Sequence, residues 1–572
     1  MPSTTLGFTM YPLTIIHLKG TQAEMGHQYG KLVLARDEDP ERERVLTSLA
    51  FRMLKDANSH ELAGRLATGF LHMVARYGLT KMEAQRPAEY LGRSRAFFEA
   101  VDYPMSFTRH ALNMDVFQNI VGLAGRFGIK PLLQVAAPHV VPACSSLVVW
   151  DQHSSDGQLR HARNFDFPVI GIWEQQPTVV FCEPDEGLRY GYVDCFGADV
   201  PGTTGFNEAG LTVAAHTRFH KDVRFDGLAV VDLCHDIIRR ASTIEDAISI
   251  AKERPVASTW GLMVSSAQDR KAVVLECTGR QTRPLHPPEG RDYLTCANLN
   301  RLEGLVEGQV NPFPAWSEHS DCRERRFHQR ATAATLSRTD LMDALGDRSD
   351  PDSPHTQRRA GGILAQSSTV NSVVYEPEQQ QMLLSLGDTP TGLGPYVEVP
   401  WDWEQPCGEA IVKEPSVIRE RISWGSKASD EAYDHWRQAT KVEAETHDLP
   451  AVLALIDKAI ALDPDIFGYQ LGAAFLRLRQ GQWKAAFKHF ETAEKQALSP
   501  FRKGQLLLWS ARALDAMGDG AEASRRRRAL LSLTGKHLEP LRANAERELK
   551  KPIAPSKLKK LVYQLDLVDA SF

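Results

Sequence analysis

At residue 144 the chain changes from a helical pattern to a strand pattern, and this change limits the folds it can adopt. Residues 21–130 place apolar side chains three and four positions apart, as in amphipathic helices. From residue 144 to about residue 392 strand-like runs recur: SSLVVW (145–150), TVVFCE (178–183), LTVAAHT (211–217), LMVSSAQ (262–268), KAVVLECT (271–278) and MLLSLG (382–387). Helical stretches at 226–253 and 318–347 lie among these strands. Strands grouped with one or two long amphipathic helices predict a layered α+β sandwich.

The rest of the chain adds a short strand and a second domain. Residues 13–20, LTIIHLKG, read as a buried strand that ends in glycine. A chain of 572 residues is too long for one hydrophobic core. Residues 467–500 fit a 34-residue helix–turn–helix register, marked by Leu471, Gly472, Ala486, Phe490, Ala493 and Pro500. This stretch resembles tetratricopeptide repeats, and we expect about three of them.

Composition excludes several classes of protein. The formal net charge is -5 and the pI is near 6.5, so charge gives no reason to expect binding to nucleic acid or to an anionic membrane surface. No stretch approaches the roughly 18 apolar residues of a spanning helix, and the first 20 residues lack the features of a secretory signal. The eight cysteines form no CxxC pair, which favours thiols kept reduced in a cytosol. We therefore expect a cytoplasmic protein.

A predicted hairpin brings the first candidate site residues together. Cys144 opens the strand at 145–150, and Asp156-Gly157 is a strong signal for a turn between two strands. The return strand carries Arg163 and Asp166, which the turn places within a few residues of Cys144. A guanidinium beside a thiol favours the thiolate. The residues alone leave a plainer interpretation open, in which Cys144 is a small buried apolar residue and Arg163 and Asp166 form an ordinary ion pair.

These residues also carry a resemblance to a known group of enzymes. Cys-Ser-Ser-Leu-Val-Val (144–149) followed by Arg-Asn-Phe-Asp (163–166) is similar to the opening hairpin of cysteine N-terminal-nucleophile (Ntn) hydrolases. Residues 18–30, with Glu24, Gly26 and Gly30, resemble the amino-terminal motif of the acyl-CoA:6-aminopenicillanate acyltransferase-like family and of phospholipase B-like proteins. The acyltransferase-like family is the nearer match, because about 140 residues precede the cysteine. The resemblance covers about residues 12–390.

The resemblance implies an αββα sandwich and a chain that cuts itself before the nucleophile, at Ala143–Cys144. The new α-amine of Cys144 would then serve as general base, since its reference pKa of about 7.7–8.0 suits neutral pH. Ala143 departs from the glycine common in relatives at this position. The division that follows is a mostly helical propeptide or α-chain region (1–143), a catalytic β-chain region (144–405), a linker (406–429) and a tetratricopeptide-like domain (430–572).

Further site residues follow from the same resemblance. Asn298, at the end of Tyr293-Leu-Thr-Cys-Ala-Asn298, corresponds to the family's oxyanion asparagine, although Asn300 is an alternative register and a plain turn role stays open. Arg323, in Ser320-Asp-Cys-Arg323, is a candidate for positioning the amine or the acid network, and a surface helix arginine is the alternative. Where bile-salt hydrolases have an asparagine as second oxyanion donor, this chain has His216 or Thr217, so a backbone N–H is the alternative donor. Asn207-Glu-Ala-Gly210 reads as a structural turn.

We therefore predict an enzyme that hydrolyses or transfers the acyl group of a non-peptide or peptide-like amide through a thioester on Cys144. A catalytically idle scaffold, or a phospholipase B-like lipid amidase or esterase, is the alternative. No cofactor is expected. The spacing of His216, His220, Asp232, His235 and Asp236 is of a kind that arises by chance among 19 histidines, so no metal is expected. The repeat domain predicts a protein partner or self-association, and gating of the substrate is an equal alternative.

Overall fold

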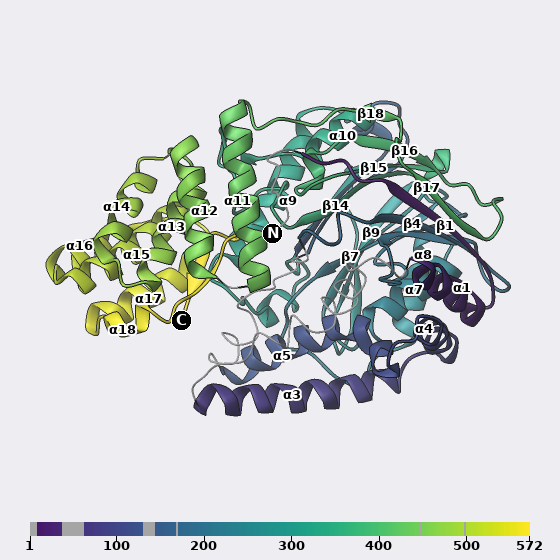
Figure 1. The fold of residues 1–572 in the computed structure, drawn as a ribbon, viewed down its shortest axis with the longest axis horizontal. Helices are drawn as coiled ribbons and strands as arrows, with labels where there is room; N and C mark the ends of the chain where they lie inside the picture. The colour runs from purple at the N-terminus through teal and green to yellow at the C-terminus, as the bar shows by residue number, and fades with distance from the viewer. Residues whose placement is uncertain (1–7, 37–61, 130–142, 168–169, 447, 497–498) are drawn as a thin grey trace.

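Two β-sheets stacked face to face form the centre of the larger domain (Figure 1). This computed structural model describes residues 8–36, 62–129, 143–167, 170–446, 448–496 and 499–572. The first sheet has the strand order β10 (Thr282–Leu285), β9 (Lys271–Cys277), β8 (Trp260–Ser266), β7 (Leu211–Thr217), β6 (Thr204–Asn207), β5 (Tyr190–Cys195), β4 (Pro177–Pro184), β1 (Leu13–Gly20) and β17 (Gly408–Val412).

The second sheet carries the hairpin predicted around Cys144. Its order is β11 (Tyr293–Cys296), β2 (Ala143–Val149), β3 (Arg160–Asp166), β14 (Thr369–Glu376), β15 (Gln381–Ser385), β16 (Tyr396–Pro400) and β18 (Val417–Arg419). All neighbours in both sheets are antiparallel except β1 and β4, which run parallel. A short pair, β12 (Ser349–Asp350) and β13 (Ser353–Gln357), lies outside the two sheets.

Helices cover the outer face of each sheet. The nine-stranded sheet packs through Ile16, Val213 and Leu262 on helices α1 (Gln22–Ala35), α3 (Leu62–Glu83), α4 (Ala88–Ala100), α5 (Asn113–Phe127), α7 (Val230–Arg240) and α8 (Ile244–Glu253). The seven-stranded sheet packs through Leu147 and Val374 on α9 (Trp316–Ala333) and α10 (Arg338–Leu345). Between the sheets lie side chains such as Phe181 and Val373. The layers run helix, sheet, sheet, helix, in agreement with the predicted sandwich.

The remaining helices form a separate body at the C-terminal end, drawn in green to yellow in Figure 1. They are α11 (Lys427–Thr446), α12 (Leu449–Leu462), α13 (Phe467–Arg479), α14 (Trp483–Glu494), α15 (Pro500–Met517), α16 (Gly520–Ser532), α17 (Glu539–Lys550) and α18 (Pro555–Leu558). A hairpin of β19 (Val562–Gln564) and β20 (Asp569–Ser571) closes the chain. Its Tyr563 and Ala570 pack in one core with Trp436, Tyr469 and Trp509. The hairpin thus fills a face of the helices, and their tetratricopeptide-like character stays a prediction.

Most strand predictions are confirmed, and one segment differs from expectation. The runs predicted at 145–150, 178–183, 211–217, 262–268, 271–278 and 382–387 correspond to β2, β4, β7, β8, β9 and β15, and LTIIHLKG (13–20) corresponds to β1. Residues 406–429, expected to be a linker, instead supply β17 and β18 at the edges of the two sheets. Both strands are short and largely exposed, so they lack the apolar alternation that identifies a strand from sequence. Among the described residues, no helix is long and apolar enough to cross a membrane.

The amino-terminal motif has a packing role. Thr21 and Glu24 form a capping box that begins α1. Gly26 and Gly30 then let α1 lie against α4, since a Cβ on Gly26 would stand 2.2 Å from the Arg93 carbonyl oxygen and one on Gly30 would stand 2.6 Å from Ala100 Cβ. The two glycines of the motif therefore set the distance between the helices.

We expect Gly26→Ala to lower the free energy of unfolding by about 1–3 kcal/mol, because the added methyl group must push two helix backbones apart. The matched control is Gly92→Ala on α4, where the new Cβ would lie 4.0 Å from Ala23 Cβ, in ordinary contact. That control should be neutral or stabilising by up to about 1 kcal/mol, since alanine is the better helix former. Urea denaturation of the full chain measures both, and equal destabilisation would contradict the packing role.

Candidate functional site

Cys144 lies near the start of β2, opposite Phe165 of β3. The connection between the strands contains Gly157 in a left-handed conformation, φ 74°, as the predicted Asp-Gly turn requires. In this register Ser146 pairs with Arg163, and the Arg163 Nη2 atom lies 3.7 Å from the Cys144 Sγ atom. Both side chains are buried. The hairpin therefore makes the predicted contact between thiol and guanidinium.

The sequence predicts that Arg163 favours the thiolate of Cys144, but burial has the larger effect on the pKa of the thiol. Burial, the largest effect, raises the pKa of the Cys144 thiol to about 11. Arg163 opposes this rise, as predicted, but does not overcome the cost of placing a charge in a buried site. Asp166 raises the pKa of the thiol further, whereas a hydrogen bond from the Asp166 backbone N–H lowers it. At neutral pH the Cys144 thiol is therefore protonated.

Asn298 contacts the main chain of Cys144. The Cys144 N–H donates to the Asn298 Oδ1 atom at 3.2 Å, and the Asn298 Nδ2 atom donates to the Thr217 carbonyl oxygen at 2.8 Å. A primary amide carries two N–H donors, so one remains for a ligand. Of the two asparagines left open by the sequence, Asn300 instead accepts from Arg218. The structure thus brings Asn298, and not Asn300, to Cys144.

Arg323 is fully buried and connects three parts of the site. Its Nη1 atom donates to the Cys144 carbonyl oxygen at 2.6 Å, and its Nη2 atom donates to Asn298 Oδ1 at 2.6 Å. The same Nη1 atom lies 3.6 Å from Asp166 Oδ2. One turn earlier on α9, the Ser320 hydroxyl accepts from the Asn298 backbone N–H at 2.8 Å. The Ser320–Arg323 motif therefore places two side chains against the site, and Arg323 does not lie on the surface.

Asp166 is fully buried at the end of β3. Burial raises the pKa of its carboxyl group, and the nearby charges of Arg323 and Arg163 lower it. Two residues that sequence reasoning missed hold the carboxylate: Gln366 Nε2 donates to Oδ2 and Thr369 Oγ1 donates to Oδ1, each at 2.7 Å. The polar run 366–369, just before an apolar strand, was the available signal for this contact. Because Gln366 follows Asp166 by 200 residues, no local sequence pattern indicates that the two side chains are in contact.

A small apolar cavity of about 50 Å³ lies at the thiol. Besides Cys144 and Arg163 it is lined by Ala111, Met114, Phe165, Phe167, Trp173, Val200, Thr203, Ala215, Thr217, Val230, Val231 and Trp260. Ligand pockets usually measure about 300–1,000 Å³, so a larger ligand requires lining side chains to move. Within the described residues, Arg163 Nε and Nη1 have no hydrogen-bond partner. The cavity therefore combines an apolar wall with unused donors beside the sulfur.

The other candidate positions have partners of their own. His216 bonds to the Ala214 carbonyl oxygen, His220 accepts from the Asp222 N–H, and His235 bonds to the Tyr190 hydroxyl. Across the part of the chain that the structure describes, no group of three or more His, Cys, Asp or Glu residues is arranged to hold a metal ion. The Asn207 amide caps the α7–α8 connection and its own turn, as a structural residue does.

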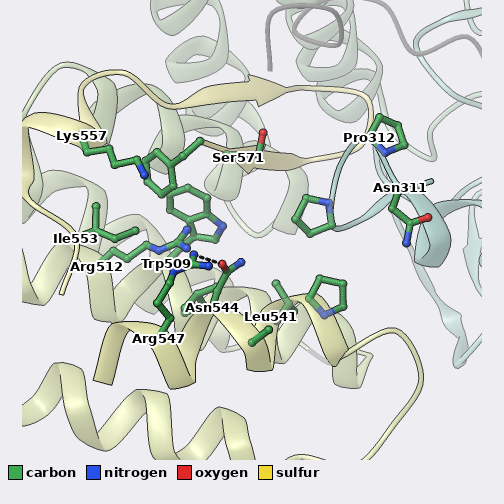
Figure 2. Close-up of a pocket in the computed structure, with 16 residues that line it drawn as sticks. Asn311, Pro312, Trp509, Arg512, Leu541, Asn544, Arg547, Ile553, Lys557 and Ser571 are labelled. Carbon is green, nitrogen blue, oxygen red and sulfur yellow. Dashed lines mark hydrogen bonds between the residues drawn. The ribbon is translucent and has the colours of Figure 1, made fainter. Parts of the chain in front are cut away.

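A second cavity, of about 580 Å³, lies between the helical domain and residues 311–314 (Figure 2). Trp509, Arg512 and Phe572 pack in its wall, with the Arg512 guanidinium 4.1 Å from the Trp509 ring centroid. Its lining includes no cysteine, histidine or carboxylate.

Comparison with known families gives a match over part of the chain. The family model that matches is acyl-coenzyme A:6-aminopenicillanic acid acyl-transferase, over residues 156–390. This match includes Arg163, Asp166, Asn298 and Arg323 and begins after Cys144. It also ends before the helical domain, which therefore lies outside the matched stretch.

Two individual proteins are similar to parts of the chain. An uncharacterized protein of Archaeoglobus fulgidus is 23% identical over 269 residues, which are 45% of this chain and 42% of that protein. The chain thus spans less than half the length of this relative. A solved structure of a Caenorhabditis elegans N-acylethanolamine-hydrolyzing acid amidase ortholog aligns with 41% of this chain and 93% of its own, at 15% identity and a TM-score of 0.31.

The buried pair of Asp166 and Arg323 generates a stability prediction. Asp166→Ala leaves the Arg323 guanidinium buried without its carboxylate, and we expect a loss of about 3–5 kcal/mol in the free energy of unfolding. The control is Asp156→Ala on the same hairpin, because Asp156 is 46% exposed and its partner Arg160 keeps Glu376 at 2.6 Å. That change should cost less than about 1 kcal/mol. Chemical denaturation that gives similar losses for both variants would show that the pair is not needed for stability.

Proposed function

We propose that this chain is a self-processing cysteine Ntn amidohydrolase or acyltransferase with Cys144 as nucleophile. The observation that carries the proposal is the arrangement around one residue: the Cys144 thiol lies beside Arg163, and the Cys144 nitrogen lies beside Asn298. Arg323 of α9 also donates to the Cys144 carbonyl oxygen and lies 3.6 Å from the Asp166 carboxylate of β3. The match to the acyltransferase family supports the same chemistry.

Self-processing would begin with attack of the Cys144 Sγ atom on the Ala143 carbonyl carbon. The C–S bond forms, the Ala143–Cys144 peptide bond breaks, and the departing nitrogen takes up a proton to become the α-amine. Water then hydrolyses the thioester, which releases the Ala143 carboxylate and returns the thiol. Because burial holds the thiol protonated at neutral pH, the first step requires proton transfer as the sulfur attacks.

In the mature enzyme one residue would supply both nucleophile and base. The Asn298 Oδ1 atom that accepts from the Cys144 N–H would hold the amine, leaving its lone pair for the thiol proton. The unused N–H of Asn298 would donate to the oxyanion, a contribution whose loss typically costs about 10²–10³ in rate. The substrate's acyl carbon forms a thioester with sulfur while the amine product leaves with the proton. Water or an acceptor amine then discharges the thioester.

The cavity supports an apolar acyl group. Its wall is made largely of aromatic and branched aliphatic side chains, including Phe165, Trp173 and Trp260. The open donors on Arg163 suit a carbonyl or other acceptor next to the reacting carbon. The preferred substrate is therefore an amide whose acyl part is apolar close to the carbonyl. A protein partner at the helical repeats stays a separate prediction.

We expect purified full-length protein to yield fragments of 143 and 429 residues, measured by intact mass spectrometry, because cleavage falls before Cys144 of the 572 residues. Cys144→Ala should remain a single chain. The matched control is Cys277→Ala, which removes another fully buried thiol outside the site and should still give both fragments. Wild-type protein that stays intact through prolonged incubation would favour an idle scaffold instead.

The class of substrate distinguishes the proposed amidohydrolase or acyltransferase from the phospholipase B-like alternative. We expect the processed enzyme to release fatty acids from N-acyl amines and Asn298→Ala to lower kcat by about 10²–10³ with a smaller change in KM, because the lost donor acts on the oxyanion. Product release followed by mass spectrometry across N-acyl amines and acyl phospholipids measures this. Activity on the phospholipids alone would support the phospholipase B-like alternative.

A further inference from the structure

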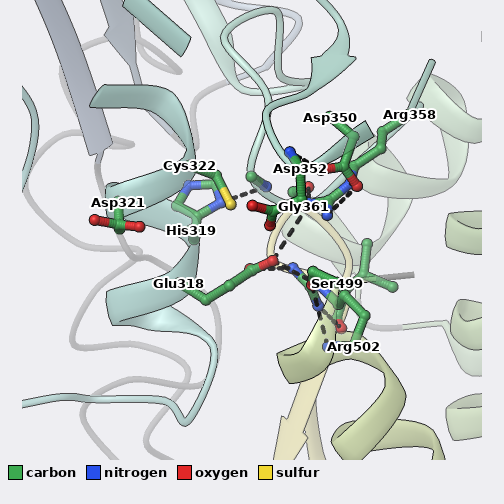
Figure 3. Close-up of polar contacts among 12 residues, drawn as sticks. Glu318, His319, Asp321, Cys322, Asp350, Asp352, Arg358, Gly361, Ser499 and Arg502 are labelled. Carbon is green, nitrogen blue, oxygen red and sulfur yellow. Dashed lines mark hydrogen bonds and ion pairs between the residues drawn. The ribbon is translucent and has the colours of Figure 1, made fainter. Parts of the chain in front are cut away.

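The helical domain reaches into the catalytic domain through a buried arginine. Arg502 of α15 lies 2.9 Å from Glu318 Oε2 on α9, and both side chains are almost fully buried (Figure 3). Arg358 also approaches Glu318, at 3.3 Å, and is itself paired with Asp350. Although burial opposes ionisation, the two arginines hold the pKa of Glu318 below its usual value. The carboxylate is therefore charged and depends on a residue of the other domain.

Contacts from the hairpin at the end of the chain and from α15 hold the start of α9. Asp569 of β20 accepts from the Ala315 N–H at 2.7 Å, at the position just before the helix, and Gln505 of α15 donates to the other oxygen of Asp569 at 2.7 Å. Arg502 further donates to the carbonyl oxygens of Leu567 and Val568, each at 3.0 Å. Glu318 stands two residues before Ser320 and five before Arg323 on this helix. The helical domain thus holds the helix whose side chains hold Asn298 and Cys144.

A second set of contacts connects the helical domain to the segment 366–369, which binds Asp166. Trp436 Nε1 of α11 donates to the Ser367 hydroxyl at 3.1 Å, and the Tyr433 hydroxyl bonds to the same oxygen at 3.2 Å. Burial raises the pKa of the Asp566 carboxyl group to about 6, and the Ser368 and Ser367 side chains oppose this rise. These two serines lie between Gln366 and Thr369, the residues that bond to the Asp166 carboxylate. Both sets of contacts arise from parts of the chain that follow the matched family stretch.

We propose that the C-terminal helical domain is a positioning element of the Cys144 site, acting through Arg502 on α9 and through Trp436 and Asp566 on the segment 366–369. This inference rests on the proposed function, because it assigns the domain a part in that reaction. Arg502 and Glu318 touch no reacting atom and act through Arg323 and Ser320. The domain is thus a component of the active site, whatever partners its outer surface binds.

The test compares three full-length variants. Arg502→Met keeps the length of the side chain but removes the ion pair, and we expect self-cleavage to slow on the order of 10–100-fold, as small misplacements of reacting groups do. Arg502→Lys keeps the charge and should recover part of the rate. Arg512→Met is the control, because Arg512 lies on the same helix as Arg502. It breaks a buried ion pair, 2.7 Å long, between Arg512 and Glu548 of α17 in the interior of the helical domain. It should leave the rate of folded protein unchanged.

The pH dependence supplies a readout that a purely structural role would not move. A lowered pKa means that the stability from Glu318 is present above its ordinary pKa of about 4.3 and is lost as the pH falls through the lowered value. Arg502→Met removes one of the two cations, so the pKa of Glu318 rises. The acid limb of the self-cleavage rate should then move to higher pH in this variant and stay in place in Arg512→Met.

Thiol labelling makes the test independent of activity. We expect Arg502→Met to increase alkylation of Cys144 by iodoacetamide on the order of tenfold, because local opening exposes the hairpin. Exposed Cys407 and buried Cys277 serve as internal references for reagent and for global unfolding. Unchanged Cys144 labelling, or equal effects in Arg502→Met and Arg512→Met, would overturn the positioning role. Wild-type protein that never cleaves would contradict the proposed function, while the labelling would still decide the role of Arg502.

Discussion

The Arg323 guanidinium is the contact on which the site depends. Arginine keeps its charge in a buried setting only when its donors are used, and here they meet a backbone carbonyl, an amide oxygen and a carboxylate. These three acceptors belong to β2, to the loop after β11 and to β3. A single side chain from α9 therefore joins the two strands of the β2–β3 hairpin to the loop that follows β11. Any displacement of α9 is transmitted directly to Cys144.

In the proposed mechanism, the buried Cys144 thiol needs a base to take up its proton. Burial suits a nucleophile that must exclude water, but the same burial raises the pKa of Cys144 and stores the sulfur in its unreactive form. One arginine at 3.7 Å does not reverse this. An amine on the same residue is the nearest base that the covalent structure can supply. In the proposed mechanism, self-cleavage creates the α-amine of Cys144, and this amine then accepts the proton of the thiol.

Local signals predicted much of the sandwich and of the site, and long-range contacts were hidden. The Asp156-Gly157 turn and the strand runs predicted the hairpin, because register over a short turn is a local property. Asn298 and Arg323 came from motif resemblance, and their contacts agree with a shared site. The roles of Gln366, Thr369 and Arg502 depend on partners about 200 residues away, which no periodicity reports. Likewise the edge strands β17 and β18 form because β1 and β16 offer free backbone groups, and their own sequences lack a strand pattern.

The position of β1 bears on what happens to the N-terminal fragment after processing. This strand lies inside the nine-stranded sheet, parallel to β4 on one side and antiparallel to β17 on the other. Its two neighbours both come from beyond Cys144, and helices α1 and α4 bury its outer face. A cut chain would therefore remain one particle, because release of the shorter piece would tear open the sheet. Maturation would alter covalent connectivity and leave the shape of the molecule as it is.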